Sequence, residues 1–253
     1  MNIKCSYSKE LSAFLNDIVQ YVLSAYAQEL DLSNLEEIEL YKKESFQSLS
    51  DGRTVEHGTR IILSSRLIEQ LPCYCVETLL QNPNCMCIIN TLYHEMGHVN
   101  DWTKMPILYG TVSEEKDVQD IMVAMFWLEY IAEKRSYMTG LSRTIHKEYC
   151  EGFIRREWKA KEFDFQRACE SNYFYLVKAT SYFMARSSDY SERKDYLRRV
   201  KNPLLKDFIE DLDKELKKLE ECGQFDGLEP LVPLSQIIFE YRQIFSKIRY
   251  DRI

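Results

Sequence analysis

Residues 85–102 read CMCIINTLYHEMGHVNDW, and this stretch is the most informative part of the chain. The segment before it, Gln-Asn-Pro-Asn at 81–84, interrupts any earlier helix and offers an N-cap for a new one. On a helical wheel of about 100° per residue, His94 and His98 lie about 40° apart, and the apolar side chains lie about 120–200° from His94. Those apolar residues are Cys85, Ile88, Leu92, Met96 and Val99. The stretch therefore predicts an amphipathic helix that buries one face and turns both histidines into a polar cleft.

The five residues His94-Glu95-Met96-Gly97-His98 form an HExxH motif inside this helix. Two histidines one helical turn apart can direct their rings to a single metal ion. Glu95 lies about 100° further round the helix, where it can reach a water molecule on the metal. A zinc ion lowers the pKa of such a water towards about 7, and the glutamate can then take its proton. The motif predicts one catalytic zinc ion per chain, held by His94 and His98, with Glu95 as general base.

A third zinc ligand is expected in the segment 121–133, which is apolar almost all round and so predicts a buried helix. Glu129 and Glu133 lie in it one turn apart, where they would repel each other and be costly to desolvate. A bound cation would resolve both problems. We expect Glu129 to be the ligand and Glu133 to accept a hydrogen bond from the second ring nitrogen of a ligand histidine.

Other assignments of the third ligand stay open. Glu133 could be the ligand in place of Glu129, and Asp101 and His146 are further candidates in less apolar surroundings. Glu129 and Glu133 could instead form an exposed stripe paired with Lys or Arg. A metzincin extension of the motif is excluded, because it needs Gly at position 101 and His or Asp at position 104, where this chain has Asp101 and Lys104.

The two segments HEMGH at 94–98 and EYIAEKRS at 129–136 together resemble the gluzincin pattern HExxH…ExxA[DN]xxA. Compact zinc peptidases of the ImmA/IrrE regulatory type share that pattern with CAAX-type membrane endopeptidases. The resemblance implies that Glu129 is the third zinc ligand, that Ala132 is the small packing residue and that Glu133 takes the acidic position. The chain departs from the pattern at Glu133, where Asp or Asn is preferred, and at Ser136, where Ala is preferred.

Upstream of the motif, residues 35–64 predict a small β-meander of three or four strands. Asp51-Gly52 is a strong hairpin signal and His57-Gly58 a weaker one. The resemblance implies that an extended peptide lies along an edge strand above the zinc helix. The candidate strand is Thr59-Arg60-Ile61-Ile62-Leu63, which would bind peptide backbone by β-augmentation. An ordinary core strand is the alternative.

A donor for the oxyanion of the tetrahedral intermediate is a further requirement of this chemistry. Tyr137, at helical spacing from Glu133, and His146 are the residues that we favour. The chain holds seventeen Tyr, and a structural role is the ordinary one for each. The other candidates are Tyr93, Tyr130, Arg135 and Tyr149.

Composition restricts the partners and the compartment. A formal charge of −7 gives no basic footprint for nucleic acid. The longest apolar run, Ile121 to Leu128, is about half of a membrane span of roughly 20 residues. We therefore expect a soluble, cytoplasmic protein with neither nucleic acid nor membrane as partner. The pairs Cys73/Cys75 and Cys85/Cys87 are expected to be buried thiols, with a structural metal as the alternative.

These observations predict a mostly helical α+β chain, with a zincin-like catalytic core at 1–140 and a helical C-terminal region at 141–253 packed on the core. The expected function is a zinc metalloendopeptidase that acts on a specific intracellular protein; the alternative is a catalytically idle zincin scaffold that binds other proteins as an effector. Besides the helices described above, the expected helices are 9–30, 67–80 with a break at Pro72, 116–139, 142–170, 172–187, 191–200, 203–222 and 234–250.

Overall fold

The computed structural model describes most of the chain and divides it into two compact units. The described residues are 1–5, 8–41, 51–69, 71, 74–81, 86–113, 117–138, 143–155, 169–188 and 190–247. The first unit comprises 1–104 and 135–145, and the second comprises 105–134 and 146–253. This division differs from the predicted one, because it groups 105–134 with the C-terminal helices. The predicted mostly helical α+β class is confirmed.

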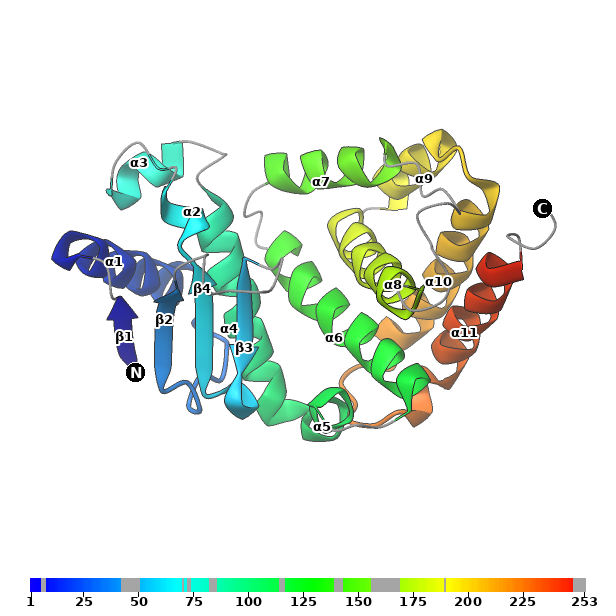
Figure 1. Ribbon diagram of the computed structural model, residues 1–253, viewed down its shortest axis with the longest axis horizontal. Helices are drawn as coiled ribbons and strands as arrows, with labels where there is room; N and C mark the ends of the chain where they lie inside the picture. The colour runs from blue at the N-terminus through cyan, green and yellow to red at the C-terminus, as the bar shows by residue number, and fades with distance from the viewer. Residues whose placement is uncertain are drawn as a thin grey trace. The chain divides into compact units, whose positions relative to one another are not determined.

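The elements of the described residues are shown in Figure 1. The strands are β1 (Asn2–Cys5), β2 (Glu37–Tyr41), β3 (Gly52–Val55) and β4 (Arg60–Ser64). The helices are α1 (Lys9–Ala25), α2 (Arg66–Glu69), α3 (Val76–Gln81), α4 (Cys87–Lys104), α5 (Pro106–Ser113), α6 (Val118–Met138), α7 (Arg143–Arg155), α8 (Cys169–Arg186), α9 (Tyr190–Arg199), α10 (Pro203–Glu221) and α11 (Val232–Lys247), with short 3-10 turns η2 (Glu56–Gly58) and η5 (Glu229–Leu231).

The sheet of the first unit has the strand order β1-β2-β4-β3. The pairs β1–β2 and β2–β4 are parallel, and only β3–β4 is antiparallel. The predicted meander is therefore wrong. Within 35–64, β3 and β4 do form a hairpin, but β4 lies between β2 and β3, so β2 pairs with β4 in parallel and not with the strand that follows it in the chain. Helix α1 is the crossover that makes the pair β1–β2 parallel as well, because it returns the chain in the same direction.

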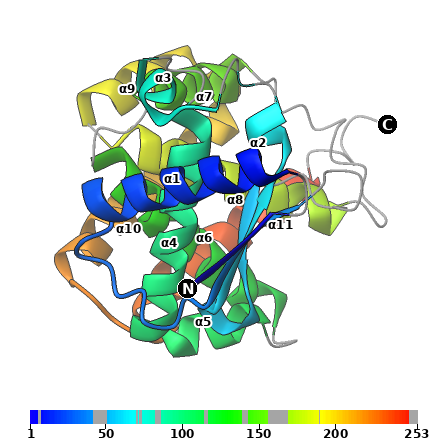
Figure 2. The same ribbon diagram turned by 90° about the vertical axis from the view of Figure 1, so that its left-hand side faces the viewer.

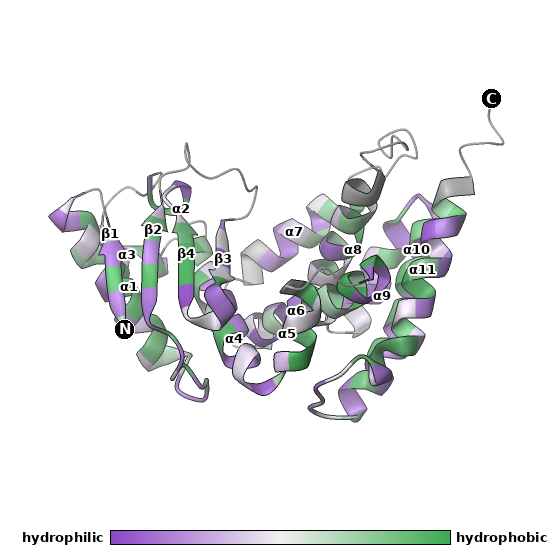
Figure 3. Cartoon of the chain, turned by 60° about the horizontal axis from the view of Figure 1, so that its bottom comes forward, coloured by the Kyte–Doolittle hydropathy of each residue, from purple (hydrophilic) through white to green (hydrophobic). Residues whose placement is uncertain are grey.

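Strand β4 is central in this sheet, and this corrects the predicted peptide-binding edge. Arg60 to Ser64 pair with β2 on one side and with β3 on the other, while Thr59 lies just before the strand. Ile61, Ile62 and Leu63 are buried and colour most of β4 green in Figure 3. Such a continuous apolar run is typical of a strand covered on both faces. The core-strand alternative is confirmed, and among the described strands β3 lies at the edge next to β4.

The turn between β3 and β4 is η2, so the hairpin signal that holds is His57-Gly58. Asp51-Gly52 instead marks the beginning of β3. Glu56, His57 and Gly58 have φ of 53°, 58° and 83°. A Cβ atom at residue 58 would lie 2.9 Å from Cβ of Trp102, so glycine is required there for both its conformation and its size.

Helices α1 and α4 cover one face of the sheet, as Figure 2 shows. Ser8 caps α1, because its hydroxyl accepts from the backbone N–H of Leu11 at 3.1 Å. The buried side chains of the two helices and of β2 and β4 form one apolar core. On α4 this core includes Ile88, Leu92 and Met96 of the predicted apolar face. A helix buried on one face alone is wrong, however, because α4 is buried all round from Ile88 to Asp101 except at Thr91.

The second unit is helical in its described residues. Asn202 caps α10 by accepting from the backbone N–H groups of Leu204 and Leu205, with Pro203 as the first helical residue. Helices α10 and α11 both carry purple and green residues in Figure 3, as amphipathic helices do, and pack on each other. Phe208 and Leu212 of α10 are fully buried in this packing.

The helices predicted from periodicity are present, with some differences at their ends. The predicted break at Pro72 lies outside the described residues, and α2 and α3 are each shorter than the predicted helix 67–80. Helix α5 was not expected. The predicted helix 142–170 corresponds to α7, and its part at 156–168 lies outside the described residues. None of the helices described is both long enough and apolar enough to cross a bilayer.

Candidate metal centre

The centre of the candidate site is the pair of histidines on α4. His94 and His98 are both buried, with 6% and 8% of their surface exposed. Their Nε2 atoms lie 3.0 Å apart, and the rings are almost perpendicular at 86°. Two nitrogens at about 2.05 Å from one tetrahedral ion would be about 3.3 Å apart. The two rings therefore already direct their Nε2 atoms to nearly the same point.

Glu129 completes a group that could hold a metal ion. One nitrogen of each histidine and one carboxylate oxygen of Glu129 all lie within 4.8 Å of one another. Two imidazole nitrogens and one carboxylate oxygen are a donor set that suits zinc and leave a coordination position open. Glu133, Asp101 and His146, the alternative ligands, are not part of this group.

Glu95 is buried beside the histidines and is held from β3. The Thr54 hydroxyl lies 2.8 Å from Oε2 of Glu95 and 3.0 Å from its backbone oxygen, so it can donate to either. A Cβ atom at residue 52 would lie 2.7 Å from Cγ2 of Thr91 and 3.0 Å from Oε1 of Glu95. Gly52 thus allows the edge strand to approach the helix at this carboxylate. Sequence reasoning missed both residues, because it assigned Gly52 to a turn.

The carboxylate of Glu129 is bonded by two residues of α8. Nζ of Lys178 lies 2.5 Å from Oε1, and the Tyr182 hydroxyl donates to Oε2 at 2.6 Å. Sequence reasoning did not single out either residue. A spacing of four residues in Lys178, Tyr182 and Arg186 was the available signal, since it puts all three on one face of a helix.

Glu133 has its own cationic partner on the same helix. Nε of Arg186 donates to Oε1 of Glu133 at 2.7 Å, and Nδ1 of His146 lies 3.6 Å from that oxygen. Burial lowers the pKa of the Arg186 guanidinium, but the charge and hydrogen bonding of Glu133 raise it, and the net shift is upward. The predicted hydrogen bond between Glu133 and a ligand histidine stays a prediction.

The two carboxylates of α6 test the exposed-stripe alternative. Glu129 and Glu133 are only 9% and 2% exposed, so an exposed stripe is wrong. The pairing with Lys and Arg that this alternative included is nevertheless present, through Lys178 and Arg186. The cations that balance these carboxylates come from the chain itself. Their burial alone therefore does not require a metal ion.

Asp101 has a structural explanation. Arg135, on the last turn of α6, donates to its Oδ1 at 2.7 Å, and the side chain of Asn100 donates to the same oxygen at 2.7 Å. Ser136 donates from the same turn to the side-chain oxygen of Asn90. These contacts hold the end of α6 against α4 within the first unit.

The predicted oxyanion donors are not part of the metal-holding group. His146 is buried on α7 beside Glu133, and Tyr137 is half-buried on α6. Tyr149 donates to the backbone oxygen of Ala179 at 3.1 Å, and burial raises its pKa. The role of Tyr137 and His146 in oxyanion binding stays a prediction.

The remaining tyrosine candidates also lie in packed surroundings. Tyr130 donates to Glu220, and burial together with that carboxylate raises its pKa. Burial likewise raises the pKa of Tyr93 on α4. A hydroxyl with a raised pKa remains a neutral donor over the physiological range.

The cysteine pairs lie partly outside the described residues, which omit Cys73 and Cys85. Cys75 is exposed, so a buried thiol is wrong there; its Sγ lies 2.7 Å from Oε2 of Glu77. Cys87 is half-buried on α4.

No protein-family model, curated protein or solved structure matches this chain. The candidate site rests on its own residues: the two converging histidines of α4, the carboxylate held beside them by β3, and Glu129 of α6 with its partners on α8.

Proposed function

We propose that this chain is a zinc-dependent metalloendopeptidase that cleaves a protein target. The observation that carries the proposal is the convergence of two buried Nε2 atoms, 3.0 Å apart, beside a buried glutamate that belongs to the same HExxH helix. A structural zinc site has no need of a general base. The presence of Glu95 therefore favours hydrolysis over a purely structural role.

Three residues would hold the metal in this proposal: His94, His98 and Glu129. Zinc fits this nitrogen and oxygen set, and when bound it supplies a Lewis acid that acidifies water and polarises a carbonyl. Glu95 takes the proton of the attacking water and passes it to the amine that leaves when the peptide bond breaks. Glu95 is buried, with 5% of its surface exposed.

Thr54 orients the proposed general base. Its hydroxyl can donate to Oε2 of Glu95. The other oxygen of the same carboxylate, Oε1, does not take part in this hydrogen bond. Gly52 lies against Oε1, so a larger residue there would displace the carboxylate. Both contacts come from β3, and a shift of this strand would therefore change the position of the base.

The substrate would bind along β3, which replaces 59–63 as the peptide-binding strand. Among the described strands β3 pairs only with β4, so its other edge can accept an extended backbone. The same strand holds Glu95 through Thr54. A peptide added to β3 would therefore lie beside the proposed general base, and a flexible or unfolded segment is the substrate that can adopt this conformation.

The biological setting that we propose follows from the ImmA/IrrE resemblance of the motifs at 94–98 and 129–136. By that analogy the protein acts in the cytoplasm on one regulatory protein, such as a repressor or a partner factor.

The test compares the wild type with Glu95→Gln and with the control Glu10→Gln on the exposed part of α1. Metal content is measured by mass spectrometry and cleavage is measured on a panel of unstructured proteins. We expect stoichiometric zinc in all three proteins, and a loss of activity of about 10²–10⁴-fold in Glu95→Gln alone. Bound zinc without any difference in cleavage would instead favour the idle scaffold, and the absence of stoichiometric metal would make HExxH a chance motif.

A further inference from the structure

Helix α8 presents a row of donors to the two buried carboxylates of α6. Lys178, Tyr182 and Arg186 follow one another at spacings of four residues, so they lie on one face of the helix. Lys178 and Tyr182 take one oxygen each of Glu129, at 2.5 and 2.6 Å, and Arg186 takes Glu133. Each carboxylate thus has a cationic partner on α8.

The two cations of this row differ in how firmly they are held. The guanidinium of Arg186 lies 4.2 Å from the ring centroid of Tyr149, and its side chain is only 13% exposed. Nζ of Lys178 lies farther from an aromatic ring, 5.6 Å from the ring centroid of Tyr182, and its side chain is 33% exposed. Its flexible four-carbon stem can carry the ammonium group into water, whereas a stacked guanidinium has no such freedom.

We propose that Lys178 is the counter-ion of Glu129 whenever no metal ion is bound, and that a bound metal ion displaces it, while Tyr182 is a positioning residue that keeps its hydrogen bond to the other carboxylate oxygen. This inference rests on the metal-binding part of the proposed function and not on peptidase activity. It deepens that proposal, because it makes metal affinity the result of an exchange between two cations at one carboxylate.

The reason for the exchange is electrostatic. An ammonium group 2.5 Å from an oxygen of Glu129 would lie close to a divalent ion on the same carboxylate, and two like charges at such a distance repel strongly. Removal of Lys178 leaves Glu129 buried without this counter-ion when metal is absent, and it costs little when metal is bound. The variant without the lysine should therefore bind metal more tightly.

Tyr182 should have the opposite effect. Its hydrogen bond leaves one carboxylate oxygen for the metal and fixes the orientation of Glu129. Loss of such a supporting hydrogen bond typically weakens metal affinity by about 10–100-fold. The two neighbours of one carboxylate are thus expected to change metal affinity in opposite directions, a result that general damage to the fold would not produce.

The experiment measures the Zn²⁺ affinity of the full chain by competition with a chromophoric chelator, and the visible absorption spectrum of the Co²⁺-loaded protein. Lys178→Met is paired with the control Lys217→Met, whose lysine neutralises another buried carboxylate, that of Asp213, at 2.6 Å. Tyr182→Phe is paired with Tyr175→Phe, an exposed tyrosine on the same helix. We expect zinc binding about 10-fold tighter in Lys178→Met, about 10–100-fold weaker in Tyr182→Phe, and unchanged in both controls.

Thermal melting tests whether a change in zinc affinity arises from damage to the fold. Lys178→Met should melt below the wild type without metal and together with it at saturating zinc, and Lys178→Gln provides a second variant that retains polarity. Unchanged or weaker zinc binding in both lysine variants would overturn the exchange. A wild type that binds neither Zn²⁺ nor Co²⁺ would overturn it together with the metal site. A wild type that binds zinc but cleaves nothing would overturn the peptidase alone.

Discussion

Two buried carboxylates of the second unit, Asp213 and Glu129, solve the same problem in different ways. Each is buried and each is neutralised by residues of a neighbouring helix. Asp213 on α10 pairs with Arg193 of α9 and with Lys217 of its own helix. Glu129 on α6 pairs with Lys178 and accepts from Tyr182.

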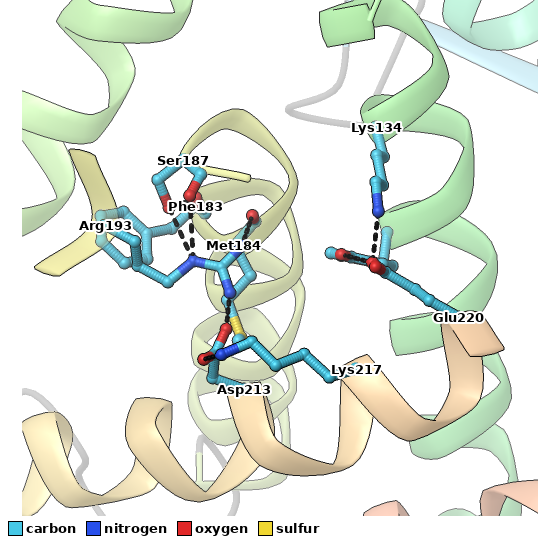
Figure 4. A network of polar contacts seen from close by, with 9 residues as sticks. Lys134, Phe183, Met184, Ser187, Arg193, Asp213, Lys217 and Glu220 are labelled. Carbon is cyan, nitrogen blue, oxygen red and sulfur yellow. Dashed lines mark hydrogen bonds and ion pairs between the residues drawn. The ribbon is translucent and has the colours of Figure 1, made fainter. Parts of the chain in front are cut away.

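Figure 4 shows the network around Asp213, whose carboxylate contacts both Arg193 and Lys217. Besides its bond to Asp213, Arg193 donates to the backbone oxygen of Met184 at 2.6 Å and to that of Ser187 at 3.0 Å. Arg193 is buried, and this burial lowers the pKa of its guanidinium. The guanidinium of Arg193 is fixed by acceptors from three residues, whereas Lys178 has the flexible, partly exposed side chain that the proposed exchange requires. The comparison teaches that the cation, and not the burial of the carboxylate, distinguishes a structural pair from a possible metal ligand.

The largest effect on stability is expected at the ion pair between Arg193 and Asp213. Arg193→Met removes the guanidinium and leaves Asp213 buried with Lys217 alone, which should lower the free energy of unfolding by about 3–5 kcal/mol. Denaturation by urea measures this loss. Zinc affinity should not change. A stability equal to that of the wild type would show that the network of Asp213 is no more firmly built than that of Glu129.

Addition of zinc tests whether Glu129 belongs to a metal site. At a free zinc concentration about 1,000-fold above the Kd, the wild type should gain about 4 kcal/mol of stability, because the ion binds the folded state only. Differential scanning calorimetry measures the gain, and a chelator should reverse it. His98→Ala should lose the gain, whereas Arg193→Met should keep it. An equal gain in His98→Ala would place the ion elsewhere.

Glu95 extends the comparison to a buried carboxylate that is held by a neutral hydroxyl. Thr54→Val removes the donor at 2.8 Å and should lower kcat/KM about 10-fold, which corresponds to about 1.4 kcal/mol. The control is Thr59→Val, whose hydroxyl donates to the backbone oxygen of Glu56 in the β3–β4 turn. If both variants cleaved an unstructured substrate equally well, β3 would have no part in placing the base.

The smallest effect is expected at Lys217, the second cation that contacts Asp213. Lys217 is 51% exposed, so Lys217→Met should cost less than about 1 kcal/mol, because solvent screens such a pair. Thermal melting of the metal-free chain, compared with that of Lys178→Met, measures the contrast. A larger loss in Lys217→Met than in Lys178→Met would reverse the order of the two lysines.

The sequence was most informative where one helix determines both the periodicity and the chemistry. The positions of Ile88, Leu92 and Met96 predicted the apolar face of α4, and they therefore predicted that His94 and His98 share the other side. Nothing beyond 3.6 residues per turn was needed for this. The acidic pair on α6 was recognised for a similar reason, since its neighbours are apolar all round.

Contacts between distant segments could not be predicted in the same way. The order of the strands depends on which earlier strand the chain lies beside after each connection. Local periodicity does not specify this order, and so the predicted meander and the predicted edge strand at 59–63 were wrong. Lys178 and Tyr182 are 49 and 53 residues beyond Glu129 in the chain, and seventeen tyrosines offered no means of choosing one. Thr54 was hidden because a short strand beginning at Gly52 resembles a turn followed by a loop.

The length of β3 has a practical consequence for inhibitors of the proposed peptidase. Its four residues extend over about 13 Å and end at the left-handed turn of Glu56 and His57. Alternate residues of an edge strand direct their backbone groups outward, so about two residues of β3 can bond an added chain. A blocking peptide of three or four residues would therefore use every backbone contact that this strand offers. Further length would add entropy cost without added hydrogen bonds, and the best competitive ligands along this strand should be short and rigid.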